Sequence, residues 1–257
     1  MRKQPESGHL LKRGIDALYN LVMAIVTFVL RLTPYGILAI MTSTIATSDF
    51  GAIWTLGKFV IASYAALIVM YIIHLIIVSG LGLNPVTFVK KAGEVLMFAY
   101  TSRSSAGSLP LNVQTQKNRL GVPDGIANFS ASFGLSIGQN GCAGIYPAML
   151  AVMVAPAAGV EVNLQFILSV IGVVIISSFG VAGVGGGATF ASIIVLSTLN
   201  LPVALAGVLI SVEPLIDMGR TALNVNDSML AGTGTAKLTN NLDKDTYNVN
   251  EYAEITN

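Results

Sequence analysis

Apolar residues form several runs along the chain that are long enough to cross a membrane. A helix rises about 1.5 Å per residue, so roughly 20 apolar residues cross the hydrocarbon core of a bilayer. The runs predict a first span at residues 15–46 and a second at residues 57–83, joined by a short external loop. A third span is predicted at residues 122–157 and a last one at residues 202–232.

Three apolar segments are broken by small or polar residues at their centres. Residues 86–116 have a serine-rich centre, and residues 163–200 have a glycine-rich centre. Each pattern is typical of a re-entrant helical hairpin, whose polar tip is tolerated only inside protein or beside a wet cavity. Residues 138–142 interrupt the third span, which we expect to be a broken helix. Interrupted segments favour a transporter, because their opened backbone can bind cations and anions.

The composition is that of a membrane protein. Of the 257 residues, 53% are hydrophobic and 11% are charged, and the mean hydropathy is +0.72; soluble domains carry about 25% charged residues. The sequence therefore predicts an all-α membrane protein with several transmembrane helices, two re-entrant helical hairpins and a broken helix. A net charge of +1 gives no reason to expect nucleic-acid binding. The single cysteine, Cys142, excludes a cysteine-cluster metal site, and no nucleophile–base set indicates an enzyme.

Basic residues predict the orientation. They gather before the first span, at Lys90 and Lys91, at Lys117 and Arg119, and in the tail. By the positive-inside rule these regions are cytoplasmic, so the segment between Lys90 and Lys117 must enter the membrane and return. The predicted organisation is a cytoplasmic lead-in, a scaffold-type helix with its external loop, a transport domain and a polar cytoplasmic tail, at residues 1–14, 15–56, 57–232 and 233–257. We expect the tail to be disordered from residue 237 on.

The last span carries the residues with the clearest chemistry. These residues share one helix face, because they lie three, four and seven positions after the first of them: Asp217, Arg220, Thr221 and Asn224. Charges inside a span usually face a cavity or a partner, so they either bind a ligand or form a self-neutralising pair inside the bundle. We favour ligand binding, because Glu213 shares the span and three other segments have opened backbone.

Smaller signals leave alternatives open. Ser104 and Ser105 either bind a ligand or bond to the preceding helical turn, and Arg103 either joins them or neutralises an acid on a neighbouring helix. The glycine run at residues 185–187 is expected to form a flexible gate rather than only a close contact between helices. His74 has no acid at a spacing that would make a relay, so we expect a packed or interfacial residue.

Three motifs resemble those of a known transporter family. RSSAGSLP, at residues 103–110, is similar to the first-hairpin signature of the dicarboxylate/amino acid:cation symporters, which have the glutamate-transporter fold. AGVGGGA, at residues 182–188, resembles their second-hairpin tip, and DMGRTALNV, at residues 217–225, resembles their last-helix signature. The motifs stand in the order of the family, and the resemblance covers the chain from the first span through Gly232. Within the family, the residues of these motifs are most similar to those of the bacterial L-cystine uptake branch.

The resemblance implies a role for each residue of the predicted site. Asp217 would bind the α-amino group of the substrate, Asn224 and Ser105 would hold its α-carboxylate, and Arg220 would meet its distal end. The predicted substrate-binding residues are Ser104, Ser105, Gly183, Val184, Glu213, Asp217, Arg220, Thr221 and Asn224. The residues expected to coordinate sodium, mainly through backbone carbonyls, are Gly138, Ser178, Phe179, Val181 and Asn224.

The resemblance also implies the setting of the site. No cofactor is expected beyond the coupling cation, which would be sodium, with a proton as the alternative. The second hairpin would act as a gate, and the partners would be a small-molecule amino acid, membrane lipid and two further copies in a homotrimer. We expect a multi-pass protein of the cell (inner) membrane. The first helices of the fold would precede residue 1, so a fragment and a mis-started reading frame are both open.

Two positions depart from the family pattern. Asn140 stands where the broken helix usually carries an acid, and Ser228 stands where an acid usually follows Asn224. Asp227 lies one position before the place of that acid. A shift of one residue rotates a helical side chain by about 100°. Both changes weaken the case for carboxylate-built sodium sites, whereas a site of backbone carbonyls is less affected. Coupling by fewer sodium ions, or by protons, stays open.

The preferred function is therefore secondary active, cation-coupled symport of an amino acid, L-cystine in the first place. The nearest alternative is a sodium symporter for dicarboxylates or for the acidic amino acids glutamate and aspartate. An alternative from another class is a non-transporting membrane fragment or subunit, whose polar residues only hold a bundle together. Glu213 bears on the choice, because it lies four residues before Asp217 and would meet the distal amine that only cystine has.

Overall fold

The computed structural model describes residues 50–180, 186–203, 209 and 212–249, with a few single positions before residue 50. The chain divides into two units, Met1–Ser48 and Asp49–Asn257, of which the second holds almost all the described residues. The predicted lead-in and most of the predicted first span lie outside the described residues.

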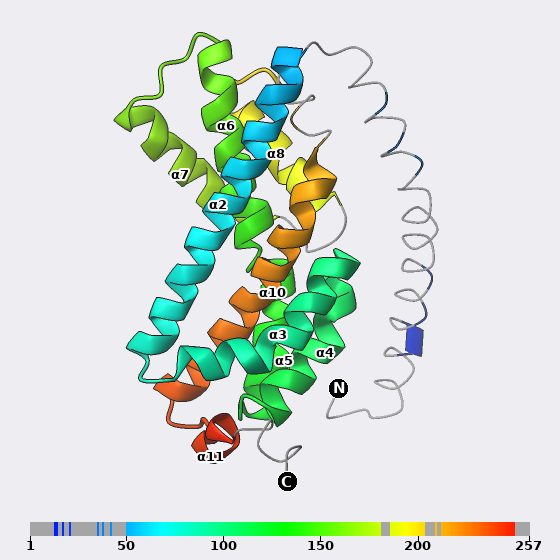
Figure 1. Cartoon of the computed structure of the whole chain (residues 1–257), viewed down its shortest axis with the longest axis vertical. Coiled ribbons are helices and arrows are strands. Elements are labelled where there is room, and N and C mark those ends of the chain that lie inside the picture. Colours follow the sequence, from blue (N-terminus) through cyan, green and yellow to red (C-terminus); the bar gives the residue numbers. More distant parts are fainter. Residues whose placement is uncertain are drawn as a thin grey trace. The chain divides into compact units, whose positions relative to one another are not determined.

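Every described element is a helix, and the described ranges contain no strand. The elements are α2 (Phe50–Gly80), α3 (Pro85–Ser102), α4 (Ser105–Asn118), α5 (Asp124–Ser136), the π-helix η1 (Asn140–Ile145), α6 (Tyr146–Ala157), α7 (Leu164–Ser178), α8 (Gly187–Thr198), α10 (Glu213–Leu238) and α11 (Lys244–Asn248). Within the second unit, α6, α7 and α8 lie at one end and α3, α4, α5 and α11 at the other (Figure 1). The predicted all-α class is confirmed.

Helix α2 has the properties of a membrane span. Its segment Leu56–Gly80 is predominantly apolar, yet large side chains such as Ile68, Ile72 and Ile76 are exposed. The segment Asp124–Ala157 is the second described stretch that is long and apolar enough to cross a membrane. Exposed apolar surface of this extent marks contact with lipid or with another protein surface.

Helices α3 and α4 form the predicted first hairpin. Only Arg103 and Ser104 join them, and Arg103 adopts the left-handed conformation that often ends a helix, with φ of 53°. The hairpin is antiparallel, because Arg119 after the end of α4 pairs with Glu94 of α3 at 2.9 Å. The beginning of α3, with Lys90, therefore lies at the same end as the last turn of α4. This geometry is the one that the sequence predicts; the side of the membrane stays a prediction.

The predicted broken helix is confirmed. Helix α5 ends at Ser136, and the chain resumes helical structure as η1 at Asn140 before continuing into α6. Gln139, which is buried at the break, donates a hydrogen bond from Nε2 to the Gly134 carbonyl at 3.0 Å. The same carbonyl accepts the Gly138 N–H at 3.0 Å, so the side-chain amide adds a second hydrogen bond to the last turn of α5.

Helices α7 and α8 lie in contact, as a second hairpin requires. Asn163 caps the start of α7 by accepting a hydrogen bond from the Phe166 N–H at 2.9 Å. The residues that join the two helices at the tip, 181–185, lie outside the described residues, so the predicted glycine gate is not described.

Helix α10 lies at the centre of the second unit and contacts α2, α3, α4, α5 and η1 (Figure 1). Small residues permit these contacts. A Cβ on Gly134 of α5 would lie 2.6 Å from Ser228 Cβ, and one on Gly232 would lie 1.9 Å from Gln116 Oε1. The central position of α10 is what brings its polar face against three other elements.

The predicted disorder of the tail was wrong for residues 237–249. Helix α10 continues to Leu238, and α11 follows with Tyr247 fully buried. The Tyr247 hydroxyl donates to the Asn84 carbonyl at 3.0 Å, and Lys91 Nζ donates to the Thr246 carbonyl at 2.6 Å. The polar composition suggested a solvated tail, but one buried aromatic ring and the buried Leu242 are enough to anchor this short segment.

Candidate substrate-binding site

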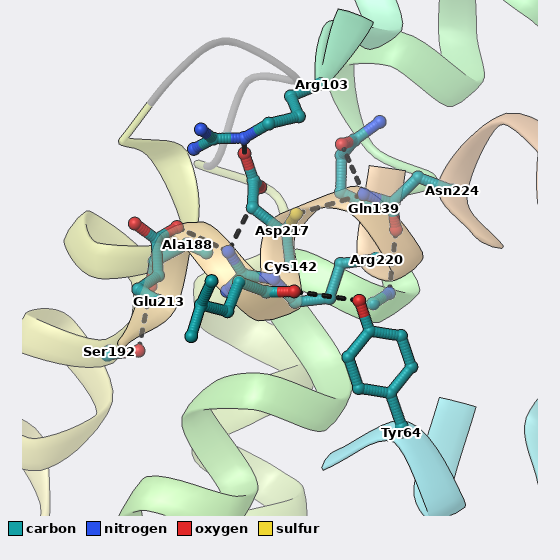
Figure 2. Close-up of polar contacts among 12 residues, drawn as sticks. Tyr64, Arg103, Gln139, Cys142, Ala188, Ser192, Glu213, Asp217, Arg220 and Asn224 are labelled. Carbon is teal, nitrogen blue, oxygen red and sulfur yellow. Dashed lines mark hydrogen bonds and ion pairs between the residues drawn. The ribbon is translucent and has the colours of Figure 1, made fainter. Parts of the chain in front are cut away.

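Asp217 lies between two arginines from different elements (Figure 2). Its Oδ2 is 3.0 Å from Arg103 Nε, at the tip of the first hairpin, and its Oδ1 is 3.0 Å from Arg220 Nη2, one turn along α10. Of the two alternatives for Arg103, the structure shows the neutralisation of an acid on a neighbouring helix. Both carboxylate oxygens of Asp217 are thus engaged by arginine.

Arg220 is the most buried charge of the site. Its side chain is 1% exposed, its Nη2 also pairs with Glu213, and its guanidinium lies over the Tyr146 ring at 4.1 Å from the centroid. A cation over an aromatic face is attracted by the ring quadrupole. Its Nε and Nη1 are buried without a hydrogen-bond partner among the described residues. Unpaired buried donors are costly, so this guanidinium is well placed to receive an acceptor group.

The four charges of this cluster sum to zero, since Arg103 and Arg220 face Glu213 and Asp217. The acids are only 13% and 14% exposed. A zwitterionic ligand can enter such a cluster without changing its net charge, because it brings one positive and one negative group.

Asn224, one turn beyond Arg220, binds the opened backbone of the broken helix. Its Oδ1 accepts from the Gly141 N–H at 2.7 Å, and its Nδ2 donates to Gln139 Oε1 at 2.9 Å and to Cys142 Sγ at 3.0 Å. Gly141 makes this approach possible, because a Cβ there would lie 3.0 Å from both the Arg220 carbonyl oxygen and Asn224 Oδ1. Gln139 was not among the predicted site residues; its place beside the helix break is the sequence signal that points to it.

The tip of the first hairpin presents the start of α4. Ser104 is the N-cap, accepting the Gly107 N–H at 3.0 Å, so its hydroxyl already has a structural use. Ser105 is the first residue of α4 and is half-buried. A helix N-terminus favours a bound carboxylate through its free N–H groups and its dipole. Ligand binding by either serine stays a prediction.

The remaining predicted residues are spread over three places. Thr221 is buried on α10, and Gly138 lies in the break between α5 and η1. Ser178 and Phe179 lie at the C-terminal end of α7, where the last carbonyls of a helix have no partner within it. Val181, Gly183 and Val184 lie outside the described residues. Among the described side chains, no group of three His, Cys, Asp or Glu residues is arranged to hold a metal ion, so a cation here would need carbonyl oxygens.

A second polar cluster surrounds His74, which is packed as predicted but has an acid partner that the sequence did not indicate. His74 on α2 is 3% exposed, and its Nε2 lies 2.8 Å from Asp227 Oδ1 on α10. Asn140 of η1 donates to the same Asp227 oxygen at 3.1 Å, and Asn226 Nδ2 lies 2.8 Å from His74 Nδ1. An acid therefore does partner His74, although no spacing in the sequence reveals it. Ser228, by contrast, faces α4, where its Oγ accepts from Asn112 Nδ2 at 2.7 Å.

Comparison with known proteins shows the family of the chain. Residues 1–238 match a family model that is described as the sodium:dicarboxylate symporter family. The L-cystine uptake protein TcyP of Bacillus licheniformis is 69% identical over 247 residues, which are 96% of this chain and 53% of that protein. TcyP of Shouchella clausii is 67% identical over the same shares, and TcyP of Bacillus cereus is 63% identical over 248 residues, 96% of this chain and 53% of that protein.

The chain spans about half the length of the curated relatives it matches. The family match extends over the first hairpin, the broken helix, the helices of the second hairpin and α10. Exposed apolar helices and a buried polar centre are what a membrane protein with an internal binding site requires. Motif order, fold and similarity all agree, and the chain belongs to the sodium:dicarboxylate symporter family.

Proposed function

We propose that this chain carries the substrate site of a secondary active, cation-coupled symporter that takes up L-cystine across the cell (inner) membrane. The observation that carries the proposal is a row of alternating charges, in which Asp217 of α10 lies between Arg103 of the first hairpin and Arg220 of α10, and Glu213 pairs with Arg220. The relatives named as L-cystine uptake proteins support the choice of substrate.

The charges match the chemistry of cystine, which has an amine and a carboxylate at each end. At one end, the α-amino group would replace Arg103 at Asp217, and the α-carboxylate would lie near Asn224 and the start of α4, at Ser105. At the other end, the carboxylate would meet the unpaired donors of Arg220, and the amine would meet Glu213. Charge-assisted hydrogen bonds of this kind are about twice as strong as neutral ones.

Sodium is the proposed coupling cation for the carbonyl-built site. The end of α7 at Ser178 and Phe179 supplies carbonyls and the negative end of a helix dipole, and the break at Gly138 and the backbone of Asn224 supply others. The functional unit is proposed to be a homotrimer with a cytoplasmic C-terminal tail, in which helices absent from this stretch would supply the scaffold.

The test uses the purified 257-residue chain in detergent and in liposomes. L-Cystine, glutamate and aspartate are titrated with and without sodium, and uptake is measured with and without an inward sodium gradient. Sodium-dependent cystine uptake supports the proposal, and Asp217→Asn and the exposed Lys90→Gln serve as site and control variants. Cystine binding without uptake would show a site-bearing fragment. Preference for glutamate or aspartate would indicate the acidic alternative, and no binding at all would leave only a structural role.

A further inference from the structure

The cluster of His74, Asp227, Asn140 and Asn226 lies outside the set of residues assigned to the substrate, and it joins three elements. α2 supplies His74, η1 supplies Asn140, and α10 supplies the other two. Asn226 is fully buried, and the side chains of His74 and Asp227 are 4% and 15% exposed. Polar groups this deeply buried normally have every hydrogen-bonding atom paired.

Three oxygens of the cluster are not paired. Asn140 Oδ1, Asn226 Oδ1 and Asp227 Oδ2 are buried without a hydrogen-bond partner among the described residues. All three are acceptors, so the cluster lacks donors rather than acceptors. A group that brings a hydrogen to this site would relieve the imbalance.

The cluster also lacks positive charge. With a neutral imidazole on His74, Asp227 leaves the cluster one negative charge, and no lysine or arginine in the described part of the chain forms an ion pair with it. Burying an unbalanced charge in a membrane protein is expensive. The neighbouring cluster at Arg220 is already neutral. The His74 cluster would become neutral too if it gained one positive charge.

The geometry around His74 accommodates two protonation states. In the first state, Nε2–H donates to Asp227 Oδ1 and Nδ1 accepts from Asn226 Nδ2. The imidazole ring is then neutral. If the Asn226 amide turns by half a rotation, its unpaired Oδ1 takes the place of Nδ2 and accepts from a protonated Nδ1. The imidazolium then donates to two oxygens, and Asp227 faces a full positive charge.

A metal cation fits less well at this place. Asp227 Oδ1 already has two nitrogens close to it, His74 Nε2 at 2.8 Å and Asn140 Nδ2 at 3.1 Å. A hard cation prefers a shell of oxygens and would have to displace these donors. A proton needs no added volume, because it occupies the lone pair of Nδ1.

The other titratable groups on the elements around His74 have different partners or positions. On α10, Glu213 and Asp217 pair with Arg220; on η1, Cys142 contacts Asn224. On α3, Tyr100 lies against Tyr64, Glu94 pairs with Arg119, and Lys91 donates to backbone carbonyls. Tyr71, one turn before His74 on α2, is the remaining neighbour in sequence.

From these observations we infer that His74 and Asp227 together bind one proton, as a second cation site beside the proposed sodium site. The proton adds to Nδ1 of His74 and leaves from the same atom, so the pair cycles between one negative charge and none. The site adjoins the substrate site, because Asn140 bonds to Asp227 while the next residue, Gly141, bonds to Asn224 one turn earlier on α10. A movement of η1 at one contact therefore changes the other.

The link to transport rests on the proposed function, and it has a measurable consequence. If a proton binds together with cystine, linkage requires the cystine Kd to rise about tenfold for each pH unit on the alkaline side of the site. The amino groups of cystine titrate too, but they do so equally for every variant. The difference between wild type and His74→Gln isolates the contribution of the site.

The experiment has one arm that needs no substrate. The chain has two histidines, so His9→Gln leaves His74 as the single imidazole for ¹⁵N NMR of histidine-labelled protein in detergent. Between about pH 9 and about pH 5, where histidines titrate, the ring should change from a neutral Nε2–H form to the doubly protonated form. In Asp227→Asn this change should differ from that of the wild type. The second arm measures proton release or uptake with an indicator dye when cystine is added, and wild type should take up about one proton more than His74→Gln.

Each outcome decides the matter. Titration of His74 that depends on Asp227 supports the site even if cystine does not bind, in which case the proposed function fails alone. A ring that stays neutral throughout overturns the inference and leaves the proposed function standing. Cystine binding without proton uptake in wild type overturns the coupling of this proton to cystine. His74 signals that respond to sodium rather than to pH would also overturn it. If Asp227→Asn does not fold, the comparison of wild type with His74→Gln still decides.

Discussion

Arg103 and Asp217 form an ion pair across 114 positions of the sequence, with Nε 3.0 Å from Oδ2. The pair ties the tip of the first hairpin to α10 at the place where the amine of the substrate is proposed to bind. Arg103 thus holds the oxygen that an ammonium group would need, so it would compete with the substrate.

Removal of this competitor gives the first prediction. Arg103→Gln should lower the cystine Kd about threefold to tenfold, because the ammonium no longer displaces an arginine from Asp217. Calorimetry on purified protein measures the change, and Lys90→Gln, which removes an exposed charge on α3, the helix that precedes Arg103, is the matched control. Weaker binding by Arg103→Gln would show instead that Arg103 contacts a carboxylate of the substrate.

The second prediction concerns Asp217 itself. Asp217→Asn should abolish binding of every α-amino acid, because an amide offers no charge to an ammonium group. The change also deprives Arg220 of one of its two acids, at a cost of about 3 kcal/mol if Glu213 does not compensate. Thermal unfolding must therefore be measured alongside binding. A folded variant that takes up substrate normally would refute the role of Asp217, and loss of stability alone would favour a structural ion pair.

Arg220 and Glu213 should separate the candidate substrates. Arg220→Ala should weaken cystine and acidic amino acids alike, since both have a distal carboxylate. Glu213→Gln can still accept the Arg220 hydrogen bond but cannot attract the distal amine of cystine. It should weaken cystine at least tenfold, about 1.4 kcal/mol, and leave glutamate and aspartate bound at least as tightly. Equal effects on all three ligands in competition binding would contradict the placement of Glu213.

Two glycines of η1 provide a matched pair. A Cβ on Gly141 would lie 3.0 Å from the Arg220 carbonyl oxygen and 3.1 Å from Arg220 Cα, whereas nothing lies within 4 Å of one on Gly144. Gly141→Ala should destabilise the protein by about 1–3 kcal/mol and weaken substrate binding, because η1 must move away from Asn224. Gly144→Ala should change neither. Denaturation midpoints and cystine titrations of both variants check this, and similar behaviour of the two would refute a tight contact at Gly141.

The short helix α11 should respond to acid. The Asp243 carboxylate accepts hydrogen bonds from the Thr246 hydroxyl at 2.6 Å and from the Thr246 and Asp245 N–H groups, and these bonds hold the pKa of Asp243 below its usual range. Since the folded pKa is depressed, the stabilisation is present at neutral pH and is lost as the pH falls through that lowered pKa. Asp243→Ala should therefore reduce the hydrogen-exchange protection of residues 244–249 at neutral pH, and Asp245→Asn should not. Protection that persists in Asp243→Ala would show that Tyr247 alone holds the helix.

Much of the fold is determined by the sequence alone. Hydrophobic runs, the serine-rich and glycine-rich breaks and the interruption near Gly138 predict the helices, the first hairpin and the broken helix, because each depends on local chemistry. The common face of Asp217, Arg220 and Asn224 follows from helical periodicity, which is equally local. The ligand roles of these residues and the cation ligands remain predictions.

Only the tertiary structure decided which residues meet across helices. His74 and Asn226 are 152 positions apart, Arg103 reaches α10 from the hairpin tip, and the Tyr146 ring lies under Arg220. Asp227 shows the reason most clearly. One residue along a helix turns a side chain by about 100°, so Asp227 faces His74 and Asn140 while Ser228 faces α4. A sequence sets what stands on each face of a helix, but the partner of that face depends on how packed helices rotate and slide against one another.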